Sequence, residues 1–171
     1  NPPEKDMMPV MATSPAGLNQ QNSPENAMGT PVIFGSDHAG FALKEQLKSF
    51  AASLGFDPVD VGTDTTASCD YPVFAFKLCD LVLEKNCLGV LVCGSGIGMS
   101  MAANRRAGIR AALCANEYMA RMTRLHNNAN VLCLGERWAG PGLAQSITEA
   151  FLQTRFEGGR HQRRIELFDT L

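Results

Sequence analysis

The residues with the clearest chemical potential are a cysteine and three alternate glycines, in the stretch Cys93-Gly94-Ser95-Gly96-Ile97-Gly98. An apolar run precedes this stretch and a helical pattern follows it, so Cys93 is expected where a strand ends and a helix begins. Glycines allow successive backbone N–H groups to point to one side, and a helix start adds partial positive charge. The stretch therefore predicts a cradle for an anion, with a thiol at its edge that this setting favours as a thiolate.

Two familiar nucleotide motifs do not fit this loop. A G-x-G-x-x-G sequence would need glycine where Met99 stands, and a P-loop would need Gly-Lys followed by Ser or Thr. The residues alone leave two interpretations of Cys93 about evenly matched: a reactive thiol, or a small apolar side chain that closes a strand. The buried, unreactive interpretation is favoured for the other five cysteines, which are Cys69, Cys79, Cys87, Cys114 and Cys133.

A carboxylate and an imidazole, Asp37 and His38, follow the first predicted strand. Asp37 is suited to hold a sugar hydroxyl and His38 to meet a phosphate. The alternative is that Asp37 only caps a helix that begins near Ala39.

Three further candidate side chains, one histidine and two arginines, lie far from Cys93 and Asp37 in the sequence. His126 follows a predicted helix and precedes the fifth strand, which is the wrong end of the sheet for a site within one subunit. Its side chain either donates a hydrogen bond to unpaired carbonyl groups at the helix end or reaches the site of a neighbouring subunit. Arg160 and Arg164 stand four residues apart, so they would share a helix face and suit a phosphate, although such a run is more often solvated surface.

Composition narrows the class of protein. The 171 residues are 45% hydrophobic and 19% charged with a formal net charge of −2, which indicates a globular chain and makes nucleic acid an unlikely main partner. No apolar run of about 18 residues and no export signal is present, so we expect no membrane partner. The cysteines form no C-x-x-C pair, which favours reduced thiols, no metal site and a cytoplasmic location.

The elements that must position these residues follow a strand–helix alternation. Helical spacing is clearest in Leu43-to-Leu54, in Tyr71-to-Glu84 with Asp70 as a capping acceptor, and in the set Tyr118, Met122 and Leu125. A further helical pattern covers Leu143-to-Phe151. The expected strands are Val32–Gly35, Asp57–Val61, Gly89–Val92, Arg110–Leu113 and Asn130–Leu134.

This alternation predicts an α/β fold, a Rossmann-like three-layer α/β/α sandwich around a five-stranded parallel sheet. Ligands of such sheets bind beyond the carboxyl ends of the strands, where Cys93 and Asp37 are expected. Residues 1–30 show almost no periodicity, so we expect a flexible leader there and a single domain over residues 31–171.

The chain resembles the B-type ribose-5-phosphate isomerases and their galactose-6-phosphate isomerase relatives. The resemblance covers essentially Pro31 to the end, and the order and spacing of the matching stretches are highly specific. The stretches are Gly35-Ser36-Asp37-His38-Ala39-Gly40, Asp70-Tyr71-Pro72, Cys93-Gly94-Ser95-Gly96-Ile97-Gly98, Ala102-Ala103-Asn104, His126-Asn127, Asn130-Val131-Leu132 and Glu157-Gly158-Gly159-Arg160-His161.

The resemblance implies a cofactor-free aldose–ketose isomerase of the non-oxidative pentose phosphate pathway. It implies that Cys93 moves a proton between C1 and C2 and that His126 assists ring opening. The implied substrate-binding residues are Asp37, His38, Gly94, Ser95, Gly96, Ile97, Gly98, Asn127, Arg137, Arg160 and Arg164. It also implies dimers, or tetramers built from dimers, whose sites draw residues from two chains.

The branch of the family can be read from the sequence, and two alternatives to the main interpretation stay open. A second branch of the family has serine in place of the cysteine and a glutamate base four residues later; Cys93 and Ile97 place this chain in the cysteine branch. A six-carbon sugar phosphate, from galactose or allose, is an alternative substrate. A non-catalytic module that binds phosphate through the glycine loop is a less favoured alternative.

Overall fold

A five-stranded parallel sheet forms the centre of the computed structural model, which describes residues 29–168. All five expected strands are confirmed, within a residue or two at each end. The strands are β1 (Pro31–Ser36), β2 (Asp57–Asp60), β3 (Leu88–Cys93), β4 (Ala111–Leu113) and β5 (Val131–Gly135). Most of the predicted leader, residues 1–28, lies outside the described residues.

The strand order is β2-β1-β3-β5-β4, and every neighbouring pair is parallel. The chain leaves β1 toward β2 on one side and then crosses to β3 on the other, so the order reverses between β1 and β3. In open α/β sheets the crevice at such a reversal is the usual ligand site. The two strands that flank it are the ones that end at Ser36 and Cys93.

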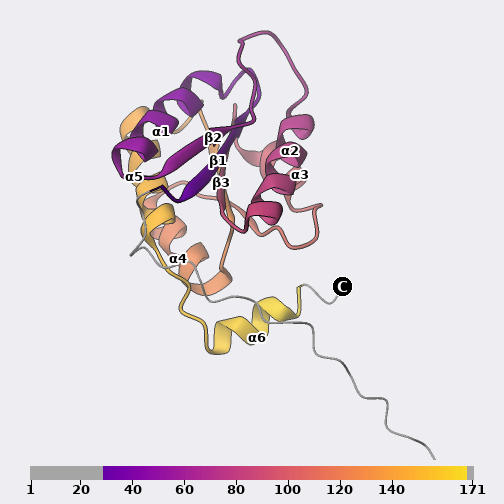
Figure 1. Ribbon diagram of the computed structural model, residues 1–171, viewed down its shortest axis with the longest axis vertical. Helices are drawn as coiled ribbons and strands as arrows, with labels where there is room; N and C mark the ends of the chain where they lie inside the picture. The colour runs from indigo at the N-terminus through magenta and orange to yellow at the C-terminus, as the bar shows by residue number, and fades with distance from the viewer. Residues whose placement is uncertain (1–28, 169–171) are drawn as a thin grey trace, which may run out of the picture.

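Helices cover both faces of the sheet and complete the predicted three-layer sandwich (Figure 1). One layer contains α1, α4 and α5, and the other contains α2 and α3, while α6 lies below the sheet. The bounds are α1 (Phe41–Ser53), α2 (Tyr71–Lys85), α3 (Ile97–Ala103), α4 (Glu117–Asn127), α5 (Pro141–Gln153) and α6 (Arg160–Glu166).

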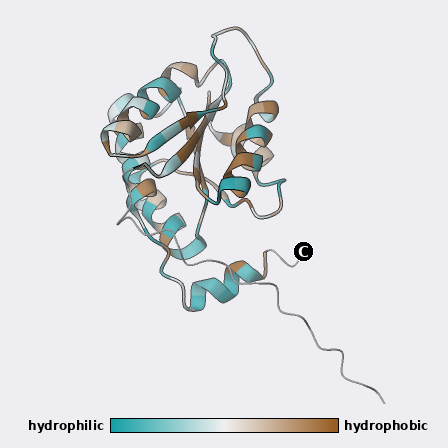
Figure 2. Cartoon of the chain, viewed as in Figure 1, coloured by the Kyte–Doolittle hydropathy of each residue, from teal (hydrophilic) through white to brown (hydrophobic). Residues whose placement is uncertain are grey.

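The period-two alternation of the strands divides the core between the two faces. Val32 and Phe34 of β1 pack with α1 and α5, whereas Ile33 packs with α2. Figure 2 shows the apolar residues gathered along the central strands, with polar residues on the outer sides of the helices. Cys93 belongs to the half-core of α2 and α3, so its side chain leaves the sheet toward that layer.

Two helix predictions need correction. Asp70 precedes α2 as expected, but its side chain makes no capping hydrogen bond. The expected apolar face of α4 is not its buried face: Tyr118 is 68% exposed, while Ala120 and Arg124 are buried. Spacing predicted the helix correctly but not which side packs inward, because small Ala120 allows close approach to α5 and Arg124 finds buried partners.

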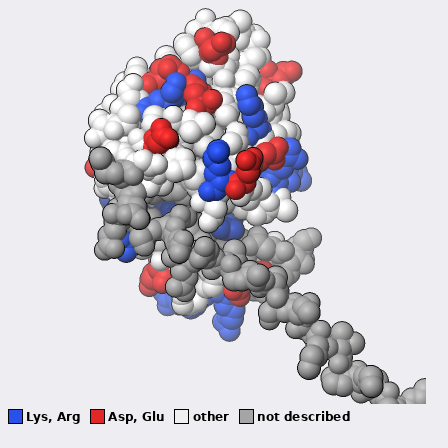
Figure 3. All heavy atoms as spheres, viewed as in Figure 1, with Lys and Arg blue, Asp and Glu red and all other residues white. Residues whose placement is uncertain are grey.

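Acidic and basic side chains are intermixed on the surface seen in Figure 3. The mixture agrees with the small net charge of −2. Within residues 29–168, no helix combines the length and the apolar character that crossing a membrane requires.

Arg124 fastens the C-terminal segment to the end of α4. Its side chain is 2% exposed and donates from Nε to the Thr154 carbonyl at 3.2 Å and from Nη1 to the Ala129 carbonyl at 2.5 Å. Burial lowers its pKa to about 10, which still leaves it charged at neutral pH. The chain after α5 is held further by the Glu157 N–H, which donates to the Leu125 carbonyl at 3.1 Å.

Replacing this guanidinium tests how much the fold depends on it. We expect Arg124→Ala to lower the free energy of unfolding by about 2–4 kcal/mol, because buried carbonyl groups lose their donor. The control Arg121→Ala removes the same side chain from the exposed side of α4 and should change stability by no more than about 0.5 kcal/mol. Urea denaturation at one protein concentration measures both, and equal midpoints for the two variants would contradict the role of Arg124.

Candidate active site

The ends of the three central strands bring the first group of predicted residues together. Ser36 pairs with Val92 and Cys93 pairs with Gly135, so Asp37 and Cys93 leave their strands at the same level. The turn after β5 is bonded to this edge, because the Arg137 N–H donates to the Gly94 carbonyl at 3.1 Å. The strand register therefore builds the edge at which sequence reasoning expected chemistry.

The Cys93 sulfur accepts a hydrogen bond from the Gly96 N–H at 3.1 Å. The residue is only 4% exposed and stands at the last position of β3. Gly96 adopts a left-handed conformation with φ +79°, and a Cβ there would lie 2.5 Å from Leu113 Cδ1. Only glycine fits this turn comfortably, and the turn is what directs the N–H toward the sulfur.

Four other cysteines are buried in surroundings that keep their thiols protonated. Burial raises the pKa of Cys79 and of Cys114 to about 12, and it also raises those of Cys87 and Cys133. All four are buried in the core, as predicted. Cys69 differs, because it is half-buried and lies beside His38.

Asp37 braces the turn before α1 instead of capping a helix that begins near Ala39, because α1 begins at Phe41 and has no side-chain cap. Its Oδ1 accepts from the N–H groups of Ala39 and Gly40, each at 3.0 Å, and the helix α1 begins just beyond. The carboxylate is 7% exposed and is thereby fixed in orientation at the edge. Substrate contact by Asp37 stays a prediction, which its place beside the end of β3 allows.

His38 is oriented by the loop before α2. The Cys69 N–H donates to His38 Nδ1 at 3.2 Å, so Nδ1 serves as an acceptor. A neutral ring with that partner carries its proton on Nε2. His38 therefore presents a donor on its other side, which suits a phosphate or hydroxyl oxygen.

Two residues at this edge were missed as site candidates. Tyr71 lies at the start of α2, is 39% exposed, and its ring would be 2.8 Å from a Cβ at Gly98. Trp138 donates from Nε1 to the Ser95 carbonyl at 2.9 Å. The Asp-Tyr-Pro stretch was a signal that could have found Tyr71, whereas the tryptophan follows only from the folded loop. The Arg137 guanidinium lies over Gly94, 3.0 Å from an ideal Cβ position there.

His126 lies at the opposite edge of the sheet, in the last turn of α4. Its ring stacks on His161 with centroids 4.3 Å apart and an interplanar angle of 17°. Glu157 Oε2 stands between them, 3.8 Å from His126 Nε2 and 3.7 Å from His161 Nε2. Burial, followed by the positive charges of His126 and Arg160, lowers the pKa of His161.

The remaining predicted residues gather at this second edge. Asn127 ends α4, and Arg160 and Arg164 lie on α6, where all three are exposed. Strands of this sheet such as β5 are five residues long, so the two edges are separated by roughly 15 Å. Within one chain the predicted site is thus divided: the Cys93 group lies at one edge and the His126 group at the other.

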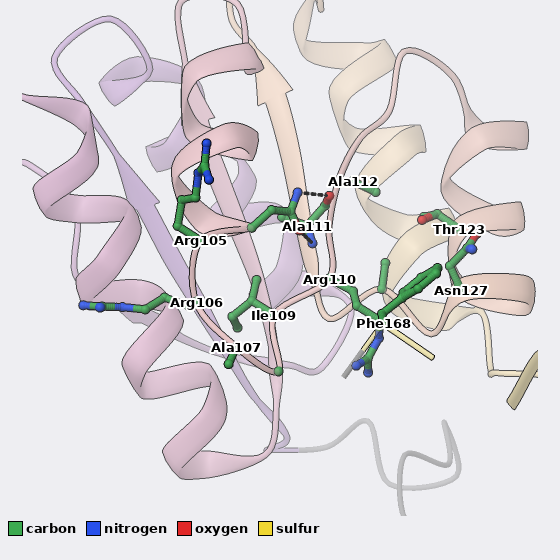
Figure 4. A pocket seen from close by; sticks show the side chains of 13 residues that line it. Arg105, Arg106, Ala107, Ile109, Arg110, Ala111, Ala112, Thr123, Asn127 and Phe168 are labelled. Carbon is green, nitrogen blue, oxygen red and sulfur yellow. Dashed lines mark hydrogen bonds between the residues drawn. The ribbon is translucent and has the colours of Figure 1, made fainter. Parts of the chain in front are cut away.

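A cavity of about 1060 Å³ also opens near the second edge, lined by the loop between α3 and β4, by α4 and by Phe168. Figure 4 shows that Arg105, Arg106 and Arg110 point in three different directions around it. Among the predicted site residues only Asn127 lines this cavity. This cavity therefore does not unite the two groups of predicted residues.

The fold is that of the open parallel α/β class, with a glycine turn next to the reversal of strand order where enzymes of this class bind their ligands. A profile of the Ribose/Galactose Isomerase family matches residues 32–168, and the chain belongs to this family. It is 42% identical to "Ribose-5-phosphate isomerase B" of Escherichia coli over 136 residues, covering 79% of this chain and 91% of that protein.

Solved structures that are similar to this chain come from the same family. A Clostridium thermocellum "Ribose-5-Phosphate Isomerase B" is similar with a TM-score of 0.81 and 44% identity, covering 82% of this chain and 96% of that one. A Thermotoga maritima "ribose 5-phosphate isomerase" has a TM-score of 0.81 and 47% identity, covering 83% and 99%. These relatives confirm the resemblance and the fold class that the sequence indicated.

The turn after Cys93 can be tested by adding one methyl group. We expect Gly96→Ala to lower the free energy of unfolding by about 2–4 kcal/mol, because a left-handed backbone and a collision with Leu113 both oppose it. The control Gly142→Ala meets no atom within 4 Å in the first turn of α5, and it should be neutral or slightly stabilising. Chemical denaturation compares them; equal stability would contradict the constraint at Gly96.

Proposed function

We propose that the chain interconverts ribose 5-phosphate and ribulose 5-phosphate in the non-oxidative pentose phosphate pathway. The observation that carries this proposal is the Cys93 sulfur at the end of β3, bonded to the Gly96 N–H inside a turn of glycines. The relative that is 42% identical is called a ribose-5-phosphate isomerase, which supports the same substrate.

In this proposal Cys93 is the base. Its thiolate removes the C2 proton of the open-chain aldose, the electron pair forms the C1–C2 double bond of an enediolate, and the carbonyl oxygen at C1 takes up negative charge. The thiol then returns its proton to C1, while the O2 proton moves to O1. No atom is gained or lost, so the step needs no redox cofactor.

The turn from Gly94 to Gly98 stabilises the enediolate. Its backbone N–H groups are held by close packing of the loop against the neighbouring strands, so they do not have to reorganise when charge develops on the substrate oxygen. Losing one such donor typically costs roughly 3–4 kcal/mol of transition-state stabilisation in other enzymes. Ser95 and Ile97 contribute their backbones to this turn.

Asp37 and His38 hold the sugar at the same edge. The orientation of each is fixed before substrate arrives, Asp37 by two N–H groups and His38 by the Cys69 N–H. Preorganised contacts of this kind lower the entropic cost of bringing C2 to the thiolate.

A second copy of the chain completes the site in this proposal. His126 is assigned to ring opening, yet in one chain it lies roughly 15 Å from the Cys93 edge. A twofold axis perpendicular to the strands would place the second edge of one copy against the first edge of the other. Exposed apolar side chains on α3 and α4 support such contact: Ile97 is 48% exposed, Met101 66% and Tyr118 68%.

The guanidiniums supply the phosphate contact. Arg160 and Arg164 stand on one face of α6 beside His126, and Asn127 lies next to them at the end of α4. Arg137 comes from the Cys93 edge, so an assembled dimer would direct cations at the phosphate from both copies. The six free cysteines suit the reducing cytoplasm, where we place the protein.

A chelator-containing assay tests the proposed reaction. We expect ribose 5-phosphate to be isomerised without added metal and faster than the 6-phosphates of galactose and allose. Faster turnover of a six-carbon substrate would favour the galactose side of the family, and binding of all three without turnover would indicate a non-catalytic module. Coupled detection of the ketose product gives each rate.

The base is tested by exchange of the C2 proton with solvent deuterium. We expect Cys93→Ala to bind substrate while exchange falls by roughly 1000-fold or more, because the variant loses the base that is bonded to the Gly96 N–H of the turn. Cys69→Ser is the matched control, since it removes a nearby thiol but leaves the backbone N–H that orients His38. Exchange that survives in Cys93→Ala would remove this cysteine from the mechanism.

Mixing two inactive variants tests whether the sites are shared. If Cys93→Ala and His126→Asn chains are refolded together, about half of the dimers are mixed, and each mixed dimer contains one intact site. We therefore expect about a quarter of the wild-type activity from the mixture and almost none from either variant alone. A mixture as inactive as its components, with exchange of chains verified by mass spectrometry, would show that each site lies within one chain.

A further inference from the structure

A second group of ligating side chains surrounds His126. The nitrogen and oxygen atoms that His126, Glu157 and His161 offer all lie within 4.8 Å of one another. Both Nε2 atoms face the same Glu157 oxygen, at 3.8 and 3.7 Å. Two imidazoles and one carboxylate are the donor set of open three-ligand zinc sites.

The backbone brings the three ligands together by fixed contacts. Glu157 is tied to α4 through its N–H on the Leu125 carbonyl at 3.1 Å, one residue before His126. The chain then turns at two glycines with positive φ, Gly158 at +72° and Gly159 at +57°, and enters α6. The His161 N–H donates to the Gly158 carbonyl at 3.1 Å, which holds the second imidazole on this turn.

The buried Nε2 atom of His161 indicates that this group of side chains lacks a ligand. The residue is 5% exposed, and its Nε2 is buried without a hydrogen-bond partner among the described residues. A buried polar atom without a partner destabilises the folded chain, so a ligand that meets it is favoured. Its nearest acidic neighbour, Glu157 Oε2 at 3.7 Å, lies beyond hydrogen-bond distance but at a separation that an ion between them would bridge.

The ligands must move to close the site, because their atoms are spread over as much as 4.8 Å and the two stacked rings must tilt toward one ion. Zinc bonds of about 2.0–2.1 Å place tetrahedral ligand atoms about 3.3 Å apart, so the two N–O separations need to shorten by about half an ångström. The Glu157 side chain is 57% exposed and that of His126 39%, so both have room to adjust toward the buried His161. The nearby guanidiniums of Arg160 and Arg164 oppose a cation, and we expect weaker binding than in a closed structural zinc site.

We propose that His126, Glu157 and His161 bind a divalent transition-metal ion of the zinc class, and that the bound ion inhibits isomerisation. The ion would take the Nε2 lone pair of His126, which ring opening needs; this inhibitory effect rests on the proposed function of that residue. The two imidazole ligands favour transition metals such as zinc and nickel over calcium and magnesium.

Metal binding is tested without reference to activity. We expect metal-free protein to bind one Zn²⁺ per chain, measured by competition with a chromogenic chelator. The dissociation constant should rise at least about tenfold in Glu157→Gln and in His161→Phe, because each loses one ligand while the second keeps an aromatic ring against His126. Glu166→Gln makes the same carboxylate-to-amide change on the exposed face of α6 and should bind as wild type.

Cobalt identifies the ligands. Co²⁺ added to the Cys93→Ser chain should give visible d–d bands without the near-ultraviolet band of thiolate ligation. A thiolate band, an absence of saturable binding, or wild-type affinity in both ligand variants would overturn the site.

Inhibition is measured on the wild-type chain. Zinc should abolish most of the isomerase activity at concentrations that saturate the chelator assay, excess EDTA should restore it, and Glu157→Gln should need at least about tenfold more zinc. Full activity of the zinc-saturated protein would overturn the inhibitory proposal. If the metal-free chain isomerises none of the sugar phosphates, the proposed function fails instead, while the zinc titration still decides the site.

Discussion

Close backbone contact at the carboxyl ends of β1, β3 and β5 is the constraint on which the site depends. A Cβ on Gly40 would lie 2.4 Å from the Val92 carbonyl oxygen, and one on Gly135 would lie 2.5 Å from the Ser95 carbonyl. These contacts press the start of α1 and the turn after β5 against the loop that follows Cys93. The backbone segments on both sides of each contact are closely packed, so the loop after Cys93 is held in one conformation. The Gly96 N–H therefore stays directed at the Cys93 sulfur. Rigidity of this kind is what allows backbone donors to act on a charge that exists only briefly.

The C-terminal segment is organised by a different interaction. The buried guanidinium of Arg124 bonds carbonyl groups on both sides of it in the chain, and the segment from Thr154 to Glu157 is thereby laid along the end of α4. This places Glu157 and His161 on His126 at the edge opposite Cys93. One fold thus carries two separate groups of polar side chains, at opposite edges of the sheet, and the proposed function draws on both.

The cysteines differ in the groups that surround their sulfur atoms. Burial raises the pKa values of the core thiols at Cys79, Cys114 and Cys133, which keeps these thiols neutral. Cys93 is nearly as buried, yet its sulfur meets a backbone donor at the mouth of a glycine turn. The hydrogen bond at the end of the strand, rather than exposure, is therefore what sets Cys93 apart from these core thiols. A glycine turn next to a cysteine was the visible sign of this in the sequence.

The sequence by itself determined the five strands, the helices between them, the parallel α/β class and the family, because periodicity, glycine spacing and ordered motifs are local properties of the chain. It also placed Cys93 and Asp37 at one edge, since both directly follow strands. Only the tertiary structure decided that β5 lies between β3 and β4, that α4 buries Arg124 rather than Tyr118, and that His126 stacks on His161. These outcomes depend on contacts between residues far apart in the chain, where packing and buried hydrogen bonds override the pattern of any single segment.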